Sequence, residues 1–313
     1  MVDHFTALCT TKRRRCVNGQ RYLVVIADDY GIGPATSQGI LALGARGLVT
    51  GAVLLVNSPY AEEGVRAWRQ SGCPFELGWH PCLTLDRPLL PASQVSSLVN
   101  EKGDFWTLSS FLRRVFLGRI RAAEVLAELR AQYYRFHDLV GHPPTVVNSH
   151  QHAHLFPPVG RCLLEVLREC RPLPYVRRVQ EPLGMLARVP GARLKRAFLS
   201  LMGQRGAYHQ QRMGFPGNDW LAGITDPACV QHSNYLVHWL SRVPGKVVEL
   251  ACHPGYWDPS LIGRDCTADD GRLQRRVDEL HLMQQSSFRQ VCRQAGFTLV
   301  GPSAIHSLYA QVA

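Results

Sequence analysis

Three histidines at alternate positions form the densest group of metal-ligand side chains in the sequence, His150, His152 and His154. They follow a β-branched run at residues 145–147, which predicts a strand. On an extended chain, side chains two residues apart point to the same side, so the three imidazoles would face one cavity. In a helix, only the first and third would share a face. Neutral imidazole commonly binds zinc and similar ions, but histidines also cap helices and bond carbonyl groups. The group therefore predicts either a metal site or a structural cluster.

Other side chains that bind metals or transfer protons also follow buried apolar runs. The runs cover residues 22–27, 75–79 and 246–252, and they are followed by Asp28 with Asp29, by His80 and by His253, respectively. In parallel α/β sheets the ligand site lies beyond the carboxyl ends of the strands, so these side chains should meet His150 there. Two adjacent carboxylates after a buried strand are costly unless something uses or satisfies them. The pattern predicts a metal-assisted catalytic site.

A hydrolytic metal site needs three protein ligands and an open position for water, whose pKa the ion lowers. One carboxylate and two histidines suit Zn²⁺ and tolerate harder ions such as Mg²⁺, so we expect a divalent ion of this kind. Adjacent side chains on a strand point in opposite directions, so Asp28 and Asp29 can both serve the site only if the chain turns there. One could then bind the ion while the other takes a proton from water, and His253 could protonate an amine leaving group.

The elements that position these residues alternate between strands and helices. We expect strands at residues 22–27, 50–56, 75–80, 145–147, 175–179 and 246–252, and helices at about 35–46, 60–70, 109–140, 157–170, 183–213 and 227–241, followed by a helix-strand finish at 273–308. This alternation indicates a parallel sheet with crossover helices and hence an α/β fold. The pattern alone does not separate a closed barrel from an open sheet. No repeat or linker divides the chain, so we expect a disordered basic extension at residues 1–19 and a single domain at residues 20–313.

Three segments add expectations about ligand contacts. Residues 81–107, rich in proline and serine, should form a long loop over one end of the sheet. Residues 214–220 are predicted to form a turn-rich loop whose Trp220 either stacks on a sugar or anchors the loop to the core. Arg177 and Arg178 in the strand at 175–179 could face solvent or an anionic ligand.

Composition and charge exclude several classes of protein. Hydrophobic residues make up 46% of the chain and charged residues 19%, as in ordinary globular proteins. The net charge is +11, but the arginines are scattered rather than gathered into a basic helix, so nucleic-acid binding is not expected. No apolar run approaches the roughly 18–20 residues that a transmembrane helix needs, and no signal-peptide pattern is present. We expect a cytoplasmic protein. A homodimer is compatible with the sequence, which does not identify the oligomeric state.

The ten cysteines include no Cys-x-x-Cys pair, which argues against a structural zinc module and favours free thiols. Cys82, two residues after His80, is the cysteine expected nearest the site.

Five short motifs together carry a family resemblance. They are Ala-Asp-Asp-Tyr-Gly at 27–31, Leu-Val-Asn at 55–57, Gly-Trp-His at 78–80, Asn-Ser-His-Gln-His-Ala-His at 148–154 and Cys-His-Pro-Gly-Tyr at 252–256. In order and spacing they resemble the YdjC-like carbohydrate deacetylase family, which includes chitooligosaccharide deacetylases and hopanoid-biosynthesis deacetylases. The likeness covers about residues 21–300. It implies a distorted (β/α) barrel similar to a TIM barrel, a divalent metal and removal of an N-acetyl group from an amino sugar or glycoconjugate, so the expected partner is a small carbohydrate or a glycolipid.

Carried onto this sequence, the resemblance gives Asp29, His80 and His150 as metal ligands, Asp28 as general base and His253 as general acid. Apart from the resemblance, we expect five residues on the substrate side, namely His152, His154, Asn57, Trp220 and Tyr256, with Arg177, Arg178 and Trp257 as weaker candidates. This chain has Asn148 where chitooligosaccharide deacetylases tend to carry aspartate. Residues 183–226 match the family poorly, so substrate specificity is not carried over.

Two other functions are compatible with the same residues. The metal site could hydrolyse a different bond, such as a phosphoester, and release of acetate or of phosphate would separate these activities. The chain could also be a non-catalytic sugar-binding protein on this fold.

Overall fold

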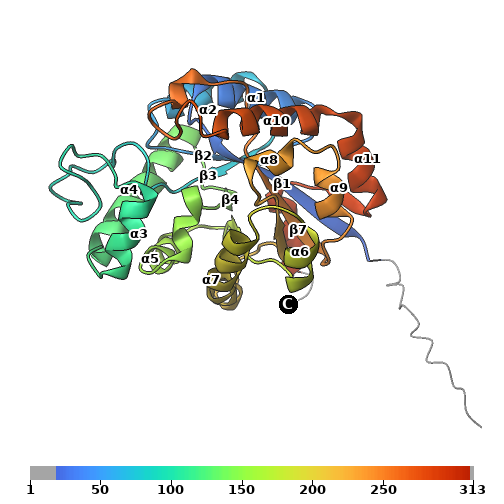
Figure 1. The fold of residues 1–313 in the computed structure, drawn as a ribbon. Helices are drawn as coiled ribbons and strands as arrows, with labels where there is room; N and C mark the ends of the chain where they lie inside the picture. The colour runs from blue at the N-terminus through green and yellow to red at the C-terminus, as the bar shows by residue number, and fades with distance from the viewer. Residues whose placement is uncertain (1–18, 311–313) are drawn as a thin grey trace, which may run out of the picture.

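A parallel β-sheet curls through the centre of the molecule, with helices packed on its outside (Figure 1). The computed structural model describes residues 19–310, so the extension expected at residues 1–19 lies almost entirely outside the described part. The strand order is β5-β4-β3-β2-β1-β7-β6, and β8 also pairs with β1. The bounds are Arg21–Tyr30 (β1), Gly51–Leu54 (β2), Glu76–Trp79 (β3), Val146–Val147 (β4), Tyr175–Val176 (β5), Trp220–Ala222 (β6), Val247–Cys252 (β7) and Phe297–Leu299 (β8).

Helices connect the strands and cover the sheet. Their bounds are Pro34–Ala45 (α1), Ala61–Gln70 (α2), Leu108–Phe116 (α3), Ala122–Val140 (α4), Val159–Leu167 (α5), Leu183–Arg188 (α6), Arg193–Arg212 (α7), Pro227–Val230 (α8), Tyr235–Leu240 (α9), Arg272–Gln284 (α10), Ser286–Gln294 (α11) and Pro302–Ala310 (α12). Two 3₁₀ helices are His150–Leu155 (η1) and Pro259–Leu261 (η2). None of the described helices combines the length and apolarity needed to span a bilayer.

The alternation of side chains along β1 divides the core into two parts. Leu23, Val25 and Ala27 pack under the surrounding helices, whereas Val24 and Ile26 pack inside the curl of the sheet. The inner core is completed by residues of other strands and of α12, namely Val53, Val146, Tyr175, Val247 and Ile305. Because side chains on a strand alternate, the next inward position on β1 after Ile26 is Asp28. The inner core therefore ends in a polar layer at the carboxyl ends of the strands.

The two edges of the sheet are joined by hydrogen bonds outside the regular ladders. Val176 N–H donates to Pro216 C=O at 2.8 Å, and Leu221 N–H donates to Gln180 C=O at 3.0 Å. Between these bonds, the buried Asn218 side chain accepts from Arg178 N–H and donates to Arg178 C=O, each at 2.8 Å. A side-chain amide thus takes the place of a ladder residue between β5 and β6. The curled sheet is closed into a distorted barrel at this seam.

The predicted α/β class and distorted barrel are confirmed, but two local predictions are wrong. The strand before the histidines stops at Val147, and His150–Leu155 form η1, in which Gln151 and His152 have φ of 53° and 55°. This turn is closed locally, because Ser149 Oγ accepts a hydrogen bond from His154 N–H at 2.9 Å. Trp220 does not lie in a loop, because it begins β6.

Candidate active site

Asp29, His80 and His150 form a buried cluster at the carboxyl ends of β1, β3 and β4. Asp29 Oδ1 lies 3.2 Å from His80 Nε2 and 3.0 Å from His150 Nδ1. One ligand atom from each residue can be chosen so that all three lie within 4.8 Å of one another. The three residues expected to bind a metal are therefore brought together from three segments, and Asp29 and His150 are 121 residues apart in sequence.

A bulge in β1 turns both aspartates toward the site. The register of β1 with β2 shifts between Ala27 and Tyr30, so the extra residue breaks the alternation of side chains. Asp29 has a φ of 64°, in the left-handed region that aspartate tolerates better than most residues. Asp28 and Asp29 can both face the site only if the chain turns between them, and this turn is present.

Backbone contacts orient the two imidazoles. His80 Nδ1 lies 2.9 Å from the carbonyl oxygen of Asn148, so this nitrogen carries a hydrogen, and Nε2 is the ring nitrogen that faces Asp29 Oδ1. His150 N–H donates to Pro81 C=O at 2.9 Å, which ties the start of η1 to the residue that follows His80. Residues at the ends of β3 and β4 thus hold each other's histidine in place.

The cluster fits a divalent ion. Ligand atoms that each lie about 2.0–2.2 Å from one zinc ion are roughly 3.0–3.5 Å apart. The distances from Asp29 Oδ1 to the two facing imidazole nitrogens, 3.2 and 3.0 Å, fall in this range. His150 Nε2 is buried without a hydrogen-bond partner, and Asp265 Oδ1 lies 3.8 Å from it. On the other side of Asp29, Arg276 of α10 donates to Oδ2 at 2.7 Å. Oδ1 is therefore left to the histidines and to an ion.

The charges around Asp29 keep it ionised. Burial alone would raise the pKa of its carboxyl, but Arg276 and His150 outweigh burial and hold it well below the usual value. Burial likewise opposes the charged form of His150, but the Asp29 carboxylate raises the pKa of this imidazole. Arg276 also contacts Asp265 at 3.2 Å. Arg276 and Asp265 were not found from the sequence, because no motif marks them.

Asp28 is held by a different cation, Arg177 of the segment after β5. The guanidinium donates from Nη1 and Nη2 to the two carboxylate oxygens at 2.6 and 2.7 Å, and Asn148 Nδ2 donates to Oδ1 at 3.2 Å. Arg177 Nε pairs with Glu249 of β7, which also accepts from Tyr175 Oη at 3.0 Å. Burial alone would raise the pKa of the Asp28 carboxyl, but Arg177 lowers it far below the usual value. Asp28 is thus a fixed carboxylate beside the Asp29-His80-His150 cluster.

The sequence contains a signal for the buried position of Arg177 that was missed. Arg177 was expected to face solvent or an anionic ligand, but it is fully buried in the barrel. Glu249 lies in the middle of an apolar buried strand, and a buried carboxylate needs a cationic partner. That requirement could have indicated an arginine at an inward position of a neighbouring strand.

His253 lies at the end of β7, on the open side of Asp28. Its Nε2 is 3.8 Å from Asp28 Oδ2, and about a third of its side chain is exposed. Glu279 of α10 accepts from its backbone N–H, and Arg275 donates to Glu279 at 2.8 Å. Burial, followed by Arg275, lowers the pKa of the imidazole, which favours the neutral form. His253 therefore lies at the partly exposed mouth of the barrel, at the carboxyl ends of the strands. Its Nε2 is slightly beyond hydrogen-bond distance of the Asp28 carboxylate.

The other two histidines of the triplet are separate from the cluster. His154 Nδ1 lies 2.6 Å from Ser149 Oγ, and burial lowers the pKa of this imidazole to about 3. His152 is partly exposed and lies edge-on to His154, with ring centroids 6.4 Å apart. The left-handed turn at His152 removes the common direction that an extended strand would have given the three side chains. The three-histidine arrangement is not formed.

The remaining predicted contacts fall in different places. Asn57 donates to Leu85 C=O at 2.9 Å and so anchors the 81–107 loop. Trp220 packs against the core under the helices, away from the inner face of the barrel. Tyr256 and Trp257 are exposed after His253, next to the start of α1. Cys82 is buried with its Sγ 3.6 Å from Leu85 C=O, and burial raises the pKa of this thiol to about 12. Among the substrate-side candidates, the two aromatic residues after His253 keep an exposed position near the mouth.

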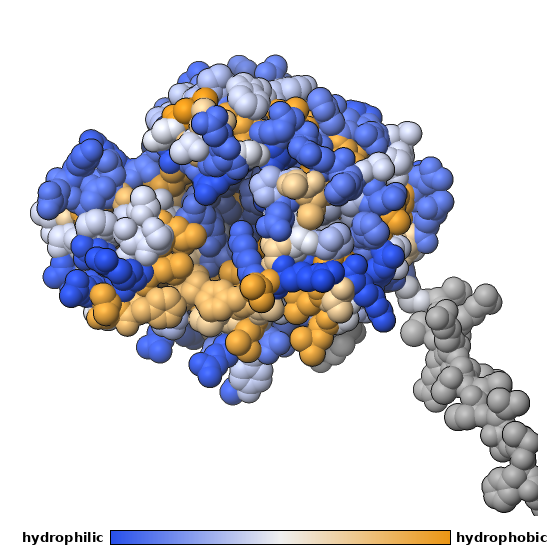
Figure 2. All heavy atoms as spheres, viewed as in Figure 1, coloured by the Kyte–Doolittle hydropathy of each residue, from blue (hydrophilic) through white to orange (hydrophobic). Residues whose placement is uncertain are grey.

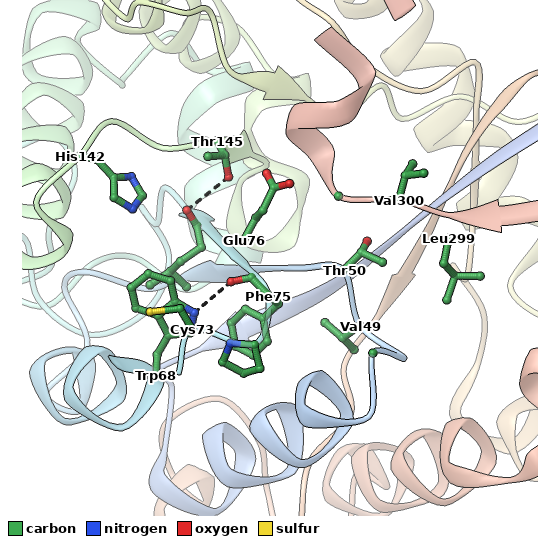
Figure 3. Close-up of a pocket in the computed structure, with 14 residues that line it drawn as sticks. Val49, Thr50, Trp68, Cys73, Phe75, Glu76, His142, Thr145, Leu299 and Val300 are labelled. Atoms are coloured by element: carbon green, nitrogen blue, oxygen red, sulfur yellow. Dashed lines mark hydrogen bonds between the residues drawn. The ribbon is translucent and has the colours of Figure 1, made fainter. Parts of the chain in front are cut away.

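A cavity of about 510 Å³ opens at the opposite end of the barrel (Figure 3). Glu76 and Thr145, which line it, precede His80 and His150 at the amino ends of β3 and β4. The Glu76 carboxylate accepts hydrogen bonds from the N–H and the Oγ of Ser303, at 3.0 and 2.7 Å. None of the residues that line this cavity belongs to the Asp29-His80-His150 cluster.

The fold and the site together define a class: a parallel α/β barrel with a buried carboxylate and two histidines at the carboxyl ends of its strands. Comparison with known proteins is more specific. The family model described as YdjC-like protein matches residues 22–294, and the chain belongs to this family.

Individual relatives differ in how much of this chain they match. A carbohydrate deacetylase of Enterococcus faecalis is 29% identical over 282 residues, which cover 88% of this chain and 95% of that protein. A carbohydrate deacetylase of Mus musculus is 37% identical over 147 residues, which cover 47% of this chain and 47% of that protein. This match therefore spans about half of the mouse protein's length. A crystal structure from Enterococcus faecalis V583, named for cellobiose-phosphate cleavage, aligns with a TM-score of 0.68 at 25% identity and covers 91% of this chain and 99% of that one.

Proposed function

We propose that this protein is a metal-dependent hydrolase that removes the N-acetyl group from an amino sugar or a glycoconjugate. The observation that carries the proposal is the buried Asp29-His80-His150 cluster beside an arginine-held Asp28. Membership of the YdjC-like family and relatives named carbohydrate deacetylase and chitooligosaccharide deacetylase support a sugar amide as the substrate.

In this proposal Asp29, His80 and His150 hold a divalent ion, either zinc or magnesium. When bound, the ion supplies a Lewis acid that lowers the pKa of water and polarises the amide carbonyl. Arg276 holds Asp29 Oδ2, so the ligand oxygen keeps a fixed direction. The Asn148 carbonyl fixes the tautomer of His80, as a group behind a metal ligand commonly does.

Proton transfer is assigned to Asp28 and His253. Asp28 takes a proton from the attacking water and passes it to Nε2 of the neutral His253, and the imidazolium so formed protonates the amine nitrogen as the C–N bond breaks. The proton lost by water thus balances the proton gained by the amine, through two groups that lie 3.8 Å apart. Because Arg177 holds Asp28 as a weak base, the carboxylate keeps the transferred proton only briefly and releases it toward His253.

Contacts with the substrate are expected around the mouth. His152, Tyr256 and Trp257 are at least partly exposed close to η1 and His253, and aromatic rings can stack on the apolar faces of sugars. His154 is buried behind His152 and orients that turn. Trp220 is not included, because its ring packs under the helices.

Metal analysis combined with measurement of released acetate tests this function. Protein stripped with a chelator should bind about one zinc or magnesium ion and then release acetate, but no phosphate, from a panel of N-acetylated and phosphorylated amino sugars. Asp28→Asn should keep the ion and lose at least about 100-fold in kcat, because the carboxylate that takes the proton from water is removed. His150→Ala should lose both the ion and the activity.

Two histidine variants serve as controls. His281→Ala changes an exposed histidine of α10 and should keep full metal content and activity. His152→Ala should keep the ion, because His152 lies outside the cluster. Full acetate release by metal-free protein, or by His150→Ala, would contradict the proposal. Phosphate as the released product would indicate the other hydrolytic reaction, and binding of sugars without turnover would indicate a sugar-binding protein.

A further inference from the structure

Helix α7 exposes a row of apolar side chains that nothing in the described chain covers. Leu194 is 89% exposed, Phe198 46% and Leu201 67%. Their spacing of four and three residues places them on one face of the helix, and Arg205 and Tyr208 continue the same row. Single exposed leucines are common on protein surfaces, but a contiguous row marks an interaction surface.

The row continues onto α3 through contacts between aromatic rings, edge-on between Phe116 and Phe156 and tilted between Phe156 and Phe198. The ring of Phe156 lies 6.2 Å from that of Phe198 on one side and 6.2 Å from that of Phe116 on the other. Phe116 and Leu117 are 69% and 56% exposed. We call the surface formed by Leu194, Phe198, Leu201, Phe116 and Leu117 the α3–α7 face. Figure 2 shows apolar atoms gathered in a band over this side of the molecule, where Figure 1 places α3, α5 and α7.

The two chain segments that carry α3 and α7 contain cations and no acidic residue, and Glu124, just after the first segment, pairs with Arg121. Residues 105–123 and 183–217 contain no aspartate or glutamate. Their exposed or half-buried cations are Arg113, Arg114, Arg119 and Arg121 near α3, and Arg188, Arg193, Lys195, Arg205 and Arg212 in and before α7. Arg193 and Lys195 flank Leu194 along the helix. An apolar row between cations is the pattern of a helix that lies in the interface of an anionic bilayer.

The α3–α7 face adjoins the candidate active site. Leu155 and Phe156 at the end of η1 pack with Leu199 of α7 in one buried cluster. The 3₁₀ helix η1 also carries His150 and His152. A membrane or protein bound to α7 therefore lies next to the end of the barrel that holds these histidines.

We propose that the α3–α7 face docks on an anionic lipid bilayer, with Leu194, Phe198 and Leu201 in the interface and the cations at the level of the headgroups. Arginine and lysine can bury their aliphatic stems while their charges reach the lipid phosphates. A second copy of this chain is a poorer occupant. A symmetric dimer through this face would set the same cations against one another without any acidic residue of these segments between them.

Binding of the full-length protein to vesicles tests the proposal and does not depend on catalysis. Vesicles of phosphatidylcholine with about a third phosphatidylglycerol should bind the wild-type protein, and vesicles of phosphatidylcholine alone should bind it at least about tenfold more weakly. Leu194→Gln combined with Leu201→Gln should weaken binding to the anionic vesicles at least about tenfold. This double variant leaves the net charge, including the basic run at residues 12–15, unchanged. Glutamine also preserves helix propensity, and Phe198 is kept because its ring packs on Phe156.

The matched control changes an exposed apolar residue elsewhere. Tyr134 of α4 is 55% exposed, and Tyr134→Gln should bind vesicles like the wild type. A Leu194→Trp variant gives a second readout, because emission from the new indole should shift to shorter wavelength when anionic vesicles are added. The proposal is overturned if the wild type ignores anionic vesicles, if the double variant binds as tightly as the wild type, or if the new tryptophan shows no shift. It is also overturned if light scattering shows a dimer that the double variant dissociates, because the face would then join two copies of the chain.

Discussion

Asp28 and Asp29 are neighbours in sequence, but each is held by its own arginine. Arg177 donates to both oxygens of Asp28, whereas Arg276 donates to one oxygen of Asp29 and leaves the other facing two histidines. A carboxylate with both oxygens occupied is fixed and weakly basic, and a carboxylate with a free oxygen can bind an ion. The roles proposed for the two residues follow from this difference.

The bidentate contact predicts that Arg177→Lys is not a conservative change. Lysine keeps the charge but cannot bind two carboxylate oxygens and Glu249 at once, so kcat should fall at least about tenfold. The free energy of unfolding should fall by about 2–4 kcal/mol, because buried charges lose partners. Acetate release and urea unfolding measure the two effects.

Arg196→Lys is the matched control for this change. Arg196 is also buried and pairs with Glu181, but it lies on α7 outside the cluster. It should lose similar stability with little change in kcat. Equal losses of kcat in both variants would mean that Arg177 acts only through general stability.

His154 predicts a specific dependence of stability on pH. Burial lowers the pKa of its imidazole from 6.5 to about 3, so the unfolded chain binds a proton that the folded chain does not. The stabilisation is therefore complete above pH 6.5 and is lost as the pH falls below this value. Between pH 8 and pH 5 this histidine should account for about 2 kcal/mol of the decrease in unfolding free energy.

His154→Gln removes this titration. In chelator-treated protein, the unfolding free energy of the variant should therefore fall by about 2 kcal/mol less than that of the wild type over pH 8 to 5. Parallel curves for the two proteins would show that His154 is not buried in its neutral form.

At the scale of elements, the close approach of β3 and β4 brings His80 to His150. A Cβ on Gly78 would lie 2.0 Å from the carbonyl oxygen of Val146, so only glycine permits this approach. The strands are short, with one paired position between them at Trp79 and Val147. The distance between the two histidines thus depends on a residue that carries no side chain.

Gly78→Ala should separate β3 from β4 and damage the metal site. We expect a loss of about 3 kcal/mol or more in unfolding free energy, as for other overpacked core positions, together with weaker metal binding. Thermal unfolding and metal titration measure both. Gly206→Ala, on α7 with nothing within 4 Å of the added Cβ, should leave metal binding unchanged and stabilise the helix by up to about 1 kcal/mol. Normal metal affinity in Gly78→Ala would contradict the dependence on this contact.

At the scale of the whole molecule, the barrel closes through Asn218. Its buried amide bonds both backbone groups of Arg178, between the two backbone hydrogen bonds that join the edges of the sheet. Closure holds the segment after β5, and with it Arg177, against the strand that carries Glu249. The seam therefore supports the network that fixes Asp28.

Asn218→Ala should open this seam. Leaving two buried backbone groups without partners should lower the unfolding free energy by about 2–3 kcal/mol. Amide exchange at Val176 and Leu221 should become faster. Asn234→Ala changes an exposed asparagine that makes no side-chain cap to α9, so its stability and exchange should stay close to wild type. Unchanged exchange at the seam in Asn218→Ala would show that the backbone bonds suffice for closure.

The sequence by itself determined the alternation of strands and helices and the residues at the strand ends. Buried strands need apolar runs, and a polar residue directly after such a run is placed at the carboxyl edge by chain geometry alone. Asp28, His80 and His253 were located in this way, and His150 was located by its place after the run at 145–147. The five motifs added the family, which the match over residues 22–294 confirms.

The tertiary structure decided which of these residues meet and which partners hold them. Gln151 and His152 take left-handed conformations because η1 closes on Ser149, which separates His152 and His154 from His150. Arg276 donates to Asp29 from a helix that lies 247 residues later in the sequence. Arg177 and Asn218 also make hydrogen bonds to distant segments, and no local sequence pattern predicts these contacts. Local periodicity reports the direction of a side chain within its own strand or helix. Contacts between distant elements depend on how the sheet curls and closes, which is a property of the packed chain as a whole.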